Sequence, residues 1–136
     1  MALKITLKPG ERMIIGGAVL TNGNSASCDL VIENKTPILR QKDILTEEKA
    51  NSPCRRIYYA IQLMYIDEDN LANYHKIYWD LVKEVVQAAP STVALIDSIN
   101  EHILHRRYYQ ALKLTKQLID YEREAIERVS GSVESV

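Results

Sequence analysis

The sequence has no phenylalanine, one tryptophan, two cysteines and no long apolar run, and each shortage excludes a class of protein. No apolar stretch approaches the roughly 20 residues that a membrane-spanning helix needs, and no signal peptide precedes the first strand pattern. Cys28 and Cys54 lie 26 positions apart. This spacing fits neither a disulfide framework nor a metal site, so the two thiols favour a reducing environment and predict a cytoplasmic location.

An excess of charge of one sign is also lacking, because 17 basic and 18 acidic residues leave a net charge of −1. No global field therefore draws the chain to nucleic acid or to a membrane, and no membrane partner is expected. The charge is unevenly placed, since residues 1–45 carry six basic and four acidic side chains, net +2, and the remainder carries −3. This asymmetry indicates that the two parts of the chain have different roles.

The 136 residues are 46% hydrophobic and 26% charged. These values are typical of globular proteins and exclude wholesale disorder. The length predicts one domain, or two small modules that share a core.

The first part of the chain shows the patterns of short strands and tight turns. Residues 3–8 alternate apolar and polar side chains, which predicts a strand with one buried face. Pro9-Gly10 favours a type II turn, Gly16-Gly17 favours a bulge or tight turn, and residues 22–25 form a strong hairpin signal. The predicted strands cover residues 3–8, 12–15, 18–21, 29–32 and 37–39. Five such strands in about 40 residues predict a small antiparallel barrel or sandwich.

From Ser52 onward the apolar positions follow a helical period. Ser52 and Pro53 are a typical N-cap and first helical residue. The predicted helices cover residues 53–66, 71–88, 92–103 and 107–129. The last helix has an apolar arc of nearly half its circumference, interrupted only by Glu122, so it should lie on a core.

These patterns together predict an α+β fold with three parts. Residues 1–48 form a small five-stranded antiparallel β module, and residues 49–129 form a four-helix layer packed as a bundle. Residues 130–136 form a flexible tail.

Motifs for catalysis, metals and cofactors have little support in the sequence. Gly16-Gly17 lacks the spacing of a phosphate-binding loop and lies between strands. His102 and His105 could share a metal, but no cysteine or further histidine joins them within a turn or two, so exposed or hinge histidines are favoured. Residues 67–69 lack the spaced ligands and the turn glycine of a calcium loop. We predict no enzyme, catalytic residue, metal or cofactor.

Six residues of the strand region define a candidate RNA-binding strip: Lys4, Thr6, Lys8, Arg12, Arg40 and Lys42. The first three share the polar face of the first strand, and Arg40 with Lys42 follows the fifth. If these two strands are neighbours, within or across subunits, their charges converge on one groove that suits a phosphate backbone. The alternative is a solvated sheet face, which charge alone favours.

Eight tyrosines and the single tryptophan all lie in the predicted helices. Tyrosine is favoured where the ring is buried and the hydroxyl stays wet, as at a partner surface. The candidate partner-binding residues are Tyr58, Tyr65, Tyr74, Tyr78 and Tyr108. The alternative, which is favoured, is that these rings are ordinary core of a small helical layer.

Several co-linear blocks of the sequence resemble the FlbT family, and the match runs from residue 1 to about residue 128. The blocks are Met1–Arg12, Gly17–Val19, Asn22-Gly23, Leu39–Ile44, Tyr59–Tyr65 and Tyr108–Lys113. Members of this family are flagellar regulators that associate with the 5′ untranslated region of flagellin mRNA and tune its translation and decay, together with FlaF. The resemblance implies a post-transcriptional repressor of flagellin synthesis.

The N-terminal blocks also resemble a diverged CsrA domain, which is an intertwined five-stranded homodimer that reads RNA loops with its first and fifth strands. These blocks are Ile5–Glu11, Met13–Gly16 and Ile38–Ile44. By position, the resemblance makes Thr6 and Lys8 the first-strand contacts and Arg40 the principal fifth-strand contact. It implies a homodimer completed by strand exchange, although the helices could instead cover the open edge and keep the chain monomeric.

Two hypotheses of function follow from these features. The preferred one is an RNA-binding regulator that holds the flagellin mRNA 5′ leader on the basic strip. The alternative is a chaperone-like module that binds flagellin or FlaF through its tyrosine-rich helices.

Overall fold

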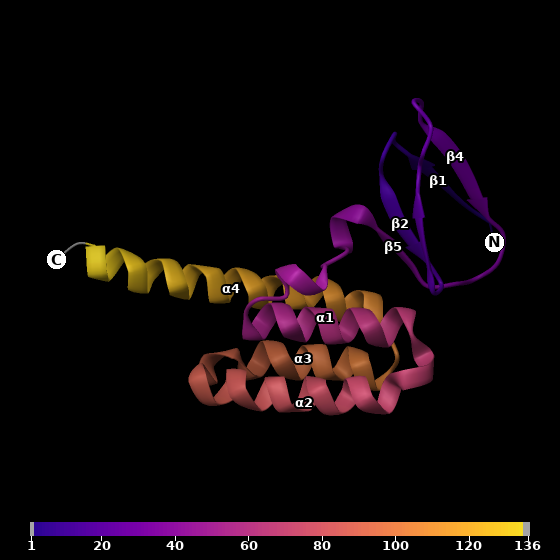
Figure 1. Ribbon diagram of the computed structural model, residues 1–136. Helices are drawn as coiled ribbons and strands as arrows, with labels where there is room; N and C mark the ends of the chain where they lie inside the picture. The colour runs from indigo at the N-terminus through magenta and orange to yellow at the C-terminus, as the bar shows by residue number, and fades with distance from the viewer. Residues whose placement is uncertain (1, 135–136) are drawn as a thin grey trace. The chain divides into compact units, whose positions relative to one another are not determined.

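The computed structural model describes residues 2–134, and the side chains of residues 2–129. The fold is α+β as predicted, with five antiparallel strands, four α-helices and short 3-10 turns (Figure 1). The strands are β1 (Leu3–Leu7), β2 (Arg12–Ile15), β3 (Ala18–Thr21), β4 (Cys28–Ile32) and β5 (Ile38–Arg40). The helices are α1 (Pro53–Ile66), α2 (Leu71–Ala88), α3 (Val93–Leu104) and α4 (Tyr108–Glu134). The 3-10 turns are η1 (Gln41–Asp43), η2 (Glu47–Lys49), η3 (Glu68–Asn70) and η4 (Pro90–Thr92).

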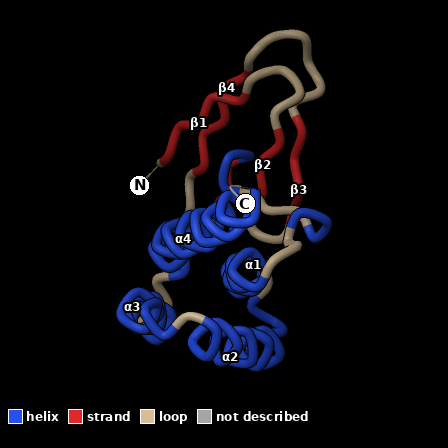
Figure 2. Tube along the Cα trace, turned by 90° about the vertical axis from the view of Figure 1, so that its left-hand side faces the viewer, coloured by secondary structure: helices blue, strands red, loops and turns tan. Residues whose placement is uncertain are grey.

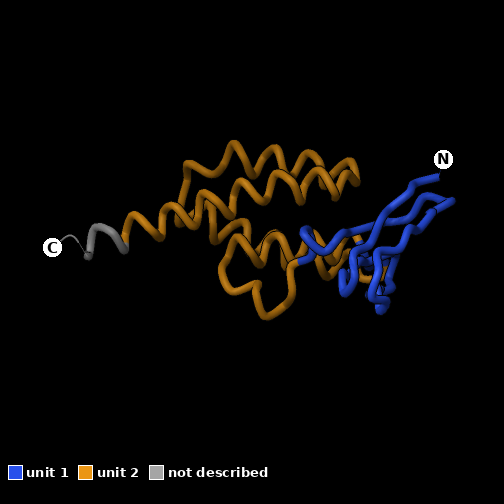
Figure 3. Tube along the Cα trace, turned by 90° about the horizontal axis from the view of Figure 1, so that it is seen from above, with its two compact units in different colours: residues 1–44, 66–68 blue, residues 45–65, 69–136 orange. Residues whose placement is uncertain are grey.

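The chain divides into two compact units (Figure 3). Unit 1 comprises residues 1–44 and 66–68, and unit 2 comprises residues 45–65 and 69–136. The predicted tail, residues 130–136, falls outside the described side chains, and residues 135–136 fall outside the described chain altogether.

Unit 1 contains two antiparallel sheets instead of a closed barrel among its described residues. β1 pairs with β4, so that Leu3 faces Ile32 and Leu7 faces Cys28. The second sheet has the order β3-β2-β5, and Met13 of its central strand β2 is fully buried. The core of the unit is a cluster around Ile5, Leu7 and Met13, against which Ile15, Cys28, Leu30, Ile32 and Ile38 pack. As the alternation along β1 predicts, Ile5 and Leu7 are buried in this core.

Two of the predicted turns are confirmed by their backbone geometry. In the Pro9-Gly10 turn, the Glu11 amide donates to the Lys8 carbonyl at 3.0 Å and Gly10 has φ +75°, as a type II turn requires. Gly16-Gly17 is the tight two-residue turn of the β2–β3 hairpin, where Gly16 has φ +59°.

The predicted hairpin at residues 22–25 is wrong, because this segment joins β3 to β4, which belong to different sheets. The reason lies in Asn22, whose buried side chain donates to the carbonyls of Leu7 at 3.0 Å and Ala26 at 3.1 Å. The side-chain oxygen Oδ1 of Asn22 accepts from the Asn24 backbone amide at 3.0 Å. Asn22 thus folds the loop on itself and ties it to the end of β1, and no ladder forms across it.

The four helices of unit 2 run side by side and are seen nearly end-on in Figure 2. α1 begins as predicted at Pro53, and the Ser52 hydroxyl accepts from the Arg55 amide at 3.3 Å. Gln62 is the polar exception on the buried face of α1. Its amide group closes two hydrogen bonds with the backbone of Leu45, at 2.8 Å and 2.9 Å, so a buried polar group is satisfied.

The turn between α3 and α4 is a Schellman motif with an arginine where glycine is usual. Arg106 has φ +57°. Its amide donates to the Ile103 carbonyl at 3.0 Å, and the Arg107 amide donates to the His102 carbonyl at 2.8 Å. The motif ends α3 and allows α4 to begin at Tyr108.

Within the described residues, no helix is both long and apolar enough to cross a membrane.

Candidate functional site

The basic strip lies entirely in unit 1, on β1, β2, β5 and η1 and on the turn after β1. Lys8 belongs to this turn and not, as predicted, to the first strand, because β1 ends at Leu7, where the Pro9-Gly10 turn begins. Lys4 and Thr6 occupy the exposed face of β1, opposite the buried Ile5 and Leu7. Lys8, Arg12 and Lys42 are exposed, and their side chains make no ion pair with any residue that the structure describes. These three cations are therefore available to a phosphate backbone.

Arg40 joins β5 to β1, which no ladder of backbone hydrogen bonds connects. Its guanidinium nitrogen Nη2 donates to the Thr6 carbonyl at 2.8 Å and lies 3.8 Å from the Glu11 carboxylate. The structure therefore brings Arg40 and Thr6 together within one chain, as the strip requires. Arg40 is half-buried, and part of its hydrogen-bonding capacity is already used by the protein.

Two acidic residues, Asp29 and Glu11, lie beside the strip and reduce its positive charge. Asp29 lies opposite Thr6 in the β1–β4 ladder and accepts from the Thr6 hydroxyl at 2.7 Å. The Lys4 ammonium lies 3.5 Å from the same carboxylate. The Thr6 hydroxyl and, next, the charge of Lys4 lower the pKa of Asp29 below its ordinary value of 3.8. The register that places Asp29 here depends on strand pairing, which the sequence pattern does not reveal.

Glu11 organises the turn that precedes β2. Its carboxylate accepts from the Lys8 amide at 2.9 Å and is the same group that lies near Arg40. The Arg12 amide donates to the Gln41 side chain at 2.7 Å, so the start of β2 is joined to η1. Both contacts hold the backbone amides of Lys8 and Arg12, whose side chains are exposed.

The five predicted partner-binding tyrosines do not share one surface. Tyr58, Tyr78 and Tyr108 are buried in the helical core. The Tyr78 hydroxyl donates to Asn100, and burial raises the pKa of Tyr78 above its ordinary value. Tyr65 and Tyr74 are half-exposed.

Tyr74 lines an apolar groove of about 420 Å³ within unit 2, between η2, α1 and α2. Tyr59, which is not among the five predicted partner-binding tyrosines, lines the same groove. The other lining residues are Glu47, Ala50, Arg56, Ala60, Leu63, Ile77 and Leu81. Because Ile77 is 43% exposed, this groove presents an apolar surface to solvent.

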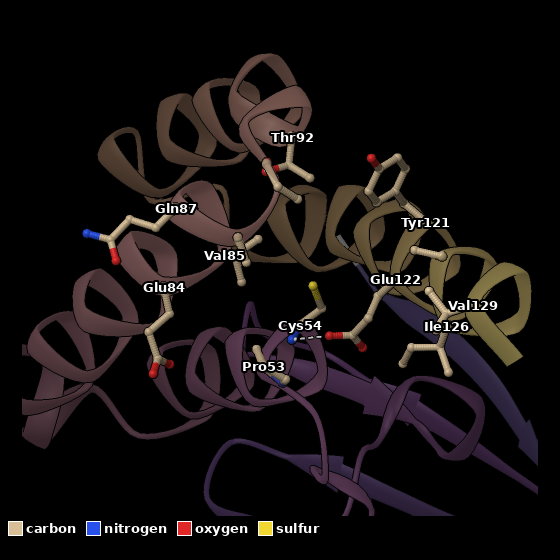
Figure 4. A pocket seen from close by; sticks show the side chains of 13 residues that line it. Pro53, Cys54, Glu84, Val85, Gln87, Thr92, Tyr121, Glu122, Ile126 and Val129 are labelled. Atoms are coloured by element: carbon tan, nitrogen blue, oxygen red, sulfur yellow. Dashed lines mark hydrogen bonds between the residues drawn. The ribbon is translucent and has the colours of Figure 1, made fainter. Parts of the chain in front are cut away.

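A second cavity of unit 2, of about 860 Å³, lies between the start of α1, the end of α2 and the later turns of α4 (Figure 4). Glu122 of α4 points into it and binds the first turn of α1. Its carboxylate accepts from the Ser52 hydroxyl at 2.5 Å and from the Cys54 amide at 3.0 Å. Glu122, the one interruption of the apolar arc of α4, is therefore an N-terminal cap supplied from another helix.

Cys54 is buried, and His102 and His105 each contact a neighbouring charged side chain. Burial, and next the charge of Glu122, raise the pKa of Cys54 to about 12, so its thiol stays protonated. His102 accepts from the Arg107 Nε at 3.0 Å, while His105 lies 3.0 Å from Glu101. No cluster of three or more potential metal ligands occurs among the residues that the structure describes.

Unit 1 thus carries exposed cations, and unit 2 carries apolar grooves. A comparison with protein families identifies the class: the model of the family described as "Flagellar protein FlbT" matches residues 3–126. The chain belongs to the FlbT family.

Curated relatives share most of their length with this chain. It is 44% identical over 135 residues to "Probable flagellum biosynthesis repressor protein FlbT 1" of Bradyrhizobium diazoefficiens, covering 99% of this chain and 89% of the relative. It is 41% identical to the "Probable flagellum biosynthesis repressor protein FlbT" of Rhodopseudomonas palustris, covering 94% of this chain and 100% of the relative. The "Flagellum biosynthesis repressor protein FlbT" of Caulobacter vibrioides is 37% identical, with 98% and 95% covered. No solved structure is significantly similar to the chain.

Proposed function

We propose that this protein represses flagellum biosynthesis by binding the 5′ leader of flagellin mRNA through the basic strip of unit 1. The relatives' names support the repressor role. The observation that carries the RNA proposal is a set of three exposed cations, Lys8, Arg12 and Lys42, which make no ion pair with any described residue and belong to the same unit as the Arg40–Thr6 contact. A strip of this kind binds a phosphate backbone by releasing counterions.

The residues of the strip have different roles in this proposal. Lys8, Arg12 and Lys42 hold phosphates. Arg40 supplies base selectivity, because a guanidinium can donate two parallel hydrogen bonds to a base edge or stack on a base. Lys4 contributes less, since its charge is already paired with Asp29 in an exposed ion pair.

The test is direct binding of the purified full chain to a flagellin 5′ leader and to a scrambled leader across a salt titration. Lys8→Ala should weaken binding to both RNAs and reduce the slope of log affinity against log salt by about 0.7. Lys35→Ala is the matched control, because Lys35 is an exposed lysine of the same unit outside the strip. Equal effects of the two substitutions would contradict the assignment of the strip.

Arg40 is tested separately because it also contacts β1. Arg40→Ala should reduce the preference for the true leader over the scrambled one, by about 1–3 kcal/mol. A variant that stays folded and keeps the full preference would show that Arg40 reads no base.

A second candidate function is the binding of an amphipathic helix of flagellin or FlaF in the groove lined by Tyr59 and Tyr74. The exposed apolar wall at Ile77 favours it, because such grooves accept the apolar face of a partner helix. Ile77→Asp should abolish co-purification at high salt. Val93→Asp should not, because Val93 is similarly exposed, at 41%, but lies outside the groove. Co-purification that survives Ile77→Asp, or that is absent from the wild type, would count against this function.

The homodimer that the CsrA-like interpretation implies stays a prediction. The β1–β4 and β2–β5 pairs form within one chain, so neither sheet needs an exchanged strand to complete these ladders.

A further inference from the structure

The first turns of α4 and the turn before them carry a cluster of positive charge on unit 2. Residues 106–116 contain four cations and no carboxylate, although residues 46–136 as a whole carry a net charge of −3. The cations are Arg106, Arg107, Lys113 and Lys116, and all four are exposed. Together with Tyr109 they form the α4 cluster. None of these five residues lines the 420 Å³ groove or the 860 Å³ cavity.

Arg106 occupies a backbone position that favours glycine. Its φ of +57° lies in the left-handed region, where a side chain is strained and glycine is not. The guanidinium is exposed and makes no hydrogen bond or ion pair with any residue that the structure describes. The fold therefore gains no contact from this side chain that would offset the strain. Strain of this kind is typical of ligand-binding sites, and it indicates a partner for the guanidinium outside the chain.

Lys113 is held in place before any ligand binds. Its ammonium lies 4.9 Å from the centre of the Tyr109 ring, one helical turn earlier in α4. Because side chains of an α-helix lean toward its N-terminus, this contact directs the charge toward the end of α4 that follows Arg106 and Arg107. The Tyr109 ring itself packs on Tyr65 of α1, with 6.5 Å between the ring centres. A charge fixed in this way loses less entropy on binding.

The contacts of Arg107 leave most of its guanidinium available. Its Nε donates to His102 Nδ1 at 3.0 Å, and its two Nη groups make no hydrogen bond or ion pair within residues 2–129. Glu101, the last acidic residue before the cluster, lies 3.0 Å from His105 and pairs with no cation of the cluster. Arg106, Arg107 and Lys113 thus keep charges that no described carboxylate neutralises.

The spacing of the cluster suits a linear polyanion. Tyr109, Lys113 and Lys116 follow one another at positions i, i+4 and i+7, so they share one face of α4 over about 10 Å. Arg106 and Arg107 lie in the turn that joins α3 to this helix (Figure 2). Guanidinium, ammonium and phenol groups all donate hydrogen bonds to phosphate oxygens, and a nucleic-acid backbone repeats such oxygens at every nucleotide.

We propose that the α4 cluster binds the phosphate backbone of RNA, as a second contact for the leader that the basic strip of unit 1 holds. This contact rests on the proposed function but lies on the other unit. Its donors meet phosphates and not base edges, so it reads no sequence. Two contacts on one chain raise the affinity, because after the first has formed the second forms intramolecularly.

The first test measures binding of the full chain to a flagellin leader and to its scrambled version across a salt titration. Lys113→Ala should reduce the slope of log affinity against log salt by about 0.7, which is a loss of about fourfold at about 0.15 M salt, for both RNAs alike. Lys83→Ala is the matched control and should change neither. Lys83 is an exposed lysine of α2 that pairs with no described carboxylate. Equal effects of the two substitutions would overturn the proposal.

Arg106 allows RNA binding to be separated from folding. Arg106→Gly should raise the midpoint of thermal unfolding, because glycine relieves the strain, and should at the same time weaken RNA binding about fourfold. Arg106→Lys keeps the charge on the same backbone, so it should bind RNA within about twofold of the wild type. A glycine variant with full RNA affinity, or one in which stability and affinity fall together, would overturn the role of Arg106.

A comparison with Lys8→Ala distinguishes failure of this contact from failure of the proposed function. The double variant Arg106→Gly/Lys113→Ala should weaken RNA binding about 15-fold and act independently of Lys8→Ala. If only Lys8→Ala weakens binding, the α4 cluster is excluded and the strip remains. If the wild type binds no RNA, both are excluded. Vesicles of phosphatidylglycerol and phosphatidylcholine test the other polyanion. Vesicle binding that the double variant abolishes, with RNA binding unchanged, would assign the cluster to a membrane surface and overturn the proposal.

Discussion

Replacing Glu122 should destabilise unit 2 more than any substitution on the exposed face of the second half of α4. Its half-buried carboxylate accepts one hydrogen bond from the Ser52 hydroxyl and one from the Cys54 amide in the first turn of α1. Hydrogen bonds to a charged group contribute about 1.5–3 kcal/mol each when buried, and an anion at a helix N-terminus adds about 0.3–1 kcal/mol. Since the site is partly open to water, we expect Glu122→Ala to cost about 2 kcal/mol.

Glu122→Gln separates the charge from the hydrogen bonds. The glutamine keeps one acceptor oxygen and loses the negative charge, so it should cost about 1 kcal/mol. The matched control is Glu124→Ala, which deletes the same side chain two positions along α4. Glu124 is exposed and makes only a 3.9 Å ion pair with Arg128, so its removal should cost less than about 0.5 kcal/mol.

Urea unfolding followed by the fluorescence of Trp79 provides the assay. Trp79 is the single tryptophan and lies on α2 of the same unit, edge-on to Tyr78 at 5.3 Å, so its signal reports this unit. With an m-value of about 2 kcal/mol/M, Glu122→Ala should lower the urea midpoint by about 1 M. A midpoint no lower than that of Glu124→Ala would refute the capping role.

Three further predictions follow from the pKa shifts and from the backbone. Folding raises the pKa of Cys54 from 9.0 to about 12 and raises that of Tyr78 above 10, so the stability that these two groups contribute is fully present below pH 9 and is lost as the pH rises further. Urea midpoints between pH 8 and 11 measure this loss, and Tyr78→Phe should reduce the decrease of the midpoint above pH 10. Thr6→Val should raise the pKa of Asp29 toward 3.8, observed by carboxyl NMR, and an unchanged titration would exclude the hydroxyl as the main cause. Arg106→Gly should stabilise the protein by about 0.5–1 kcal/mol in thermal unfolding, because glycine adopts φ +57° without a steric penalty, and a loss of stability would contradict this.

The sequence predicted the individual strands and helices because their signals are local. Pro53 after Ser52 marks the start of α1, and Gly10 and Gly16 occur where the backbone requires positive φ. Strand pairing is a long-range property, and there the local signal misled. Asn22 looks like part of a hairpin turn, yet its side chain serves a connection between two sheets.

The candidate site was predictable only in part, because residue type does not determine exposure. The strip residues Lys8 and Arg12 are charged and exposed, as their type suggests. Tyr78 is fully buried, although a tyrosine of the same helix, Tyr74, lines an open groove. The capping role of Glu122 could not be predicted from the sequence, because its partners lie about 70 positions earlier in the chain. Only the packing of α4 against α1 brings them together.

Arg40 connects the fold of unit 1 to its proposed function, and this decides how its variants should be interpreted. Its hydrogen bond to the Thr6 carbonyl is a link between β5 and β1, so Arg40→Ala removes a structural contact as well as a base reader. Arg40→Lys keeps the positive charge but loses the planar fork that two parallel bonds to a base require. If Arg40 reads RNA, the lysine variant should keep most non-specific affinity and lose leader preference. If Arg40 acts only through the fold, leader preference should instead follow the stability of unit 1 in both variants.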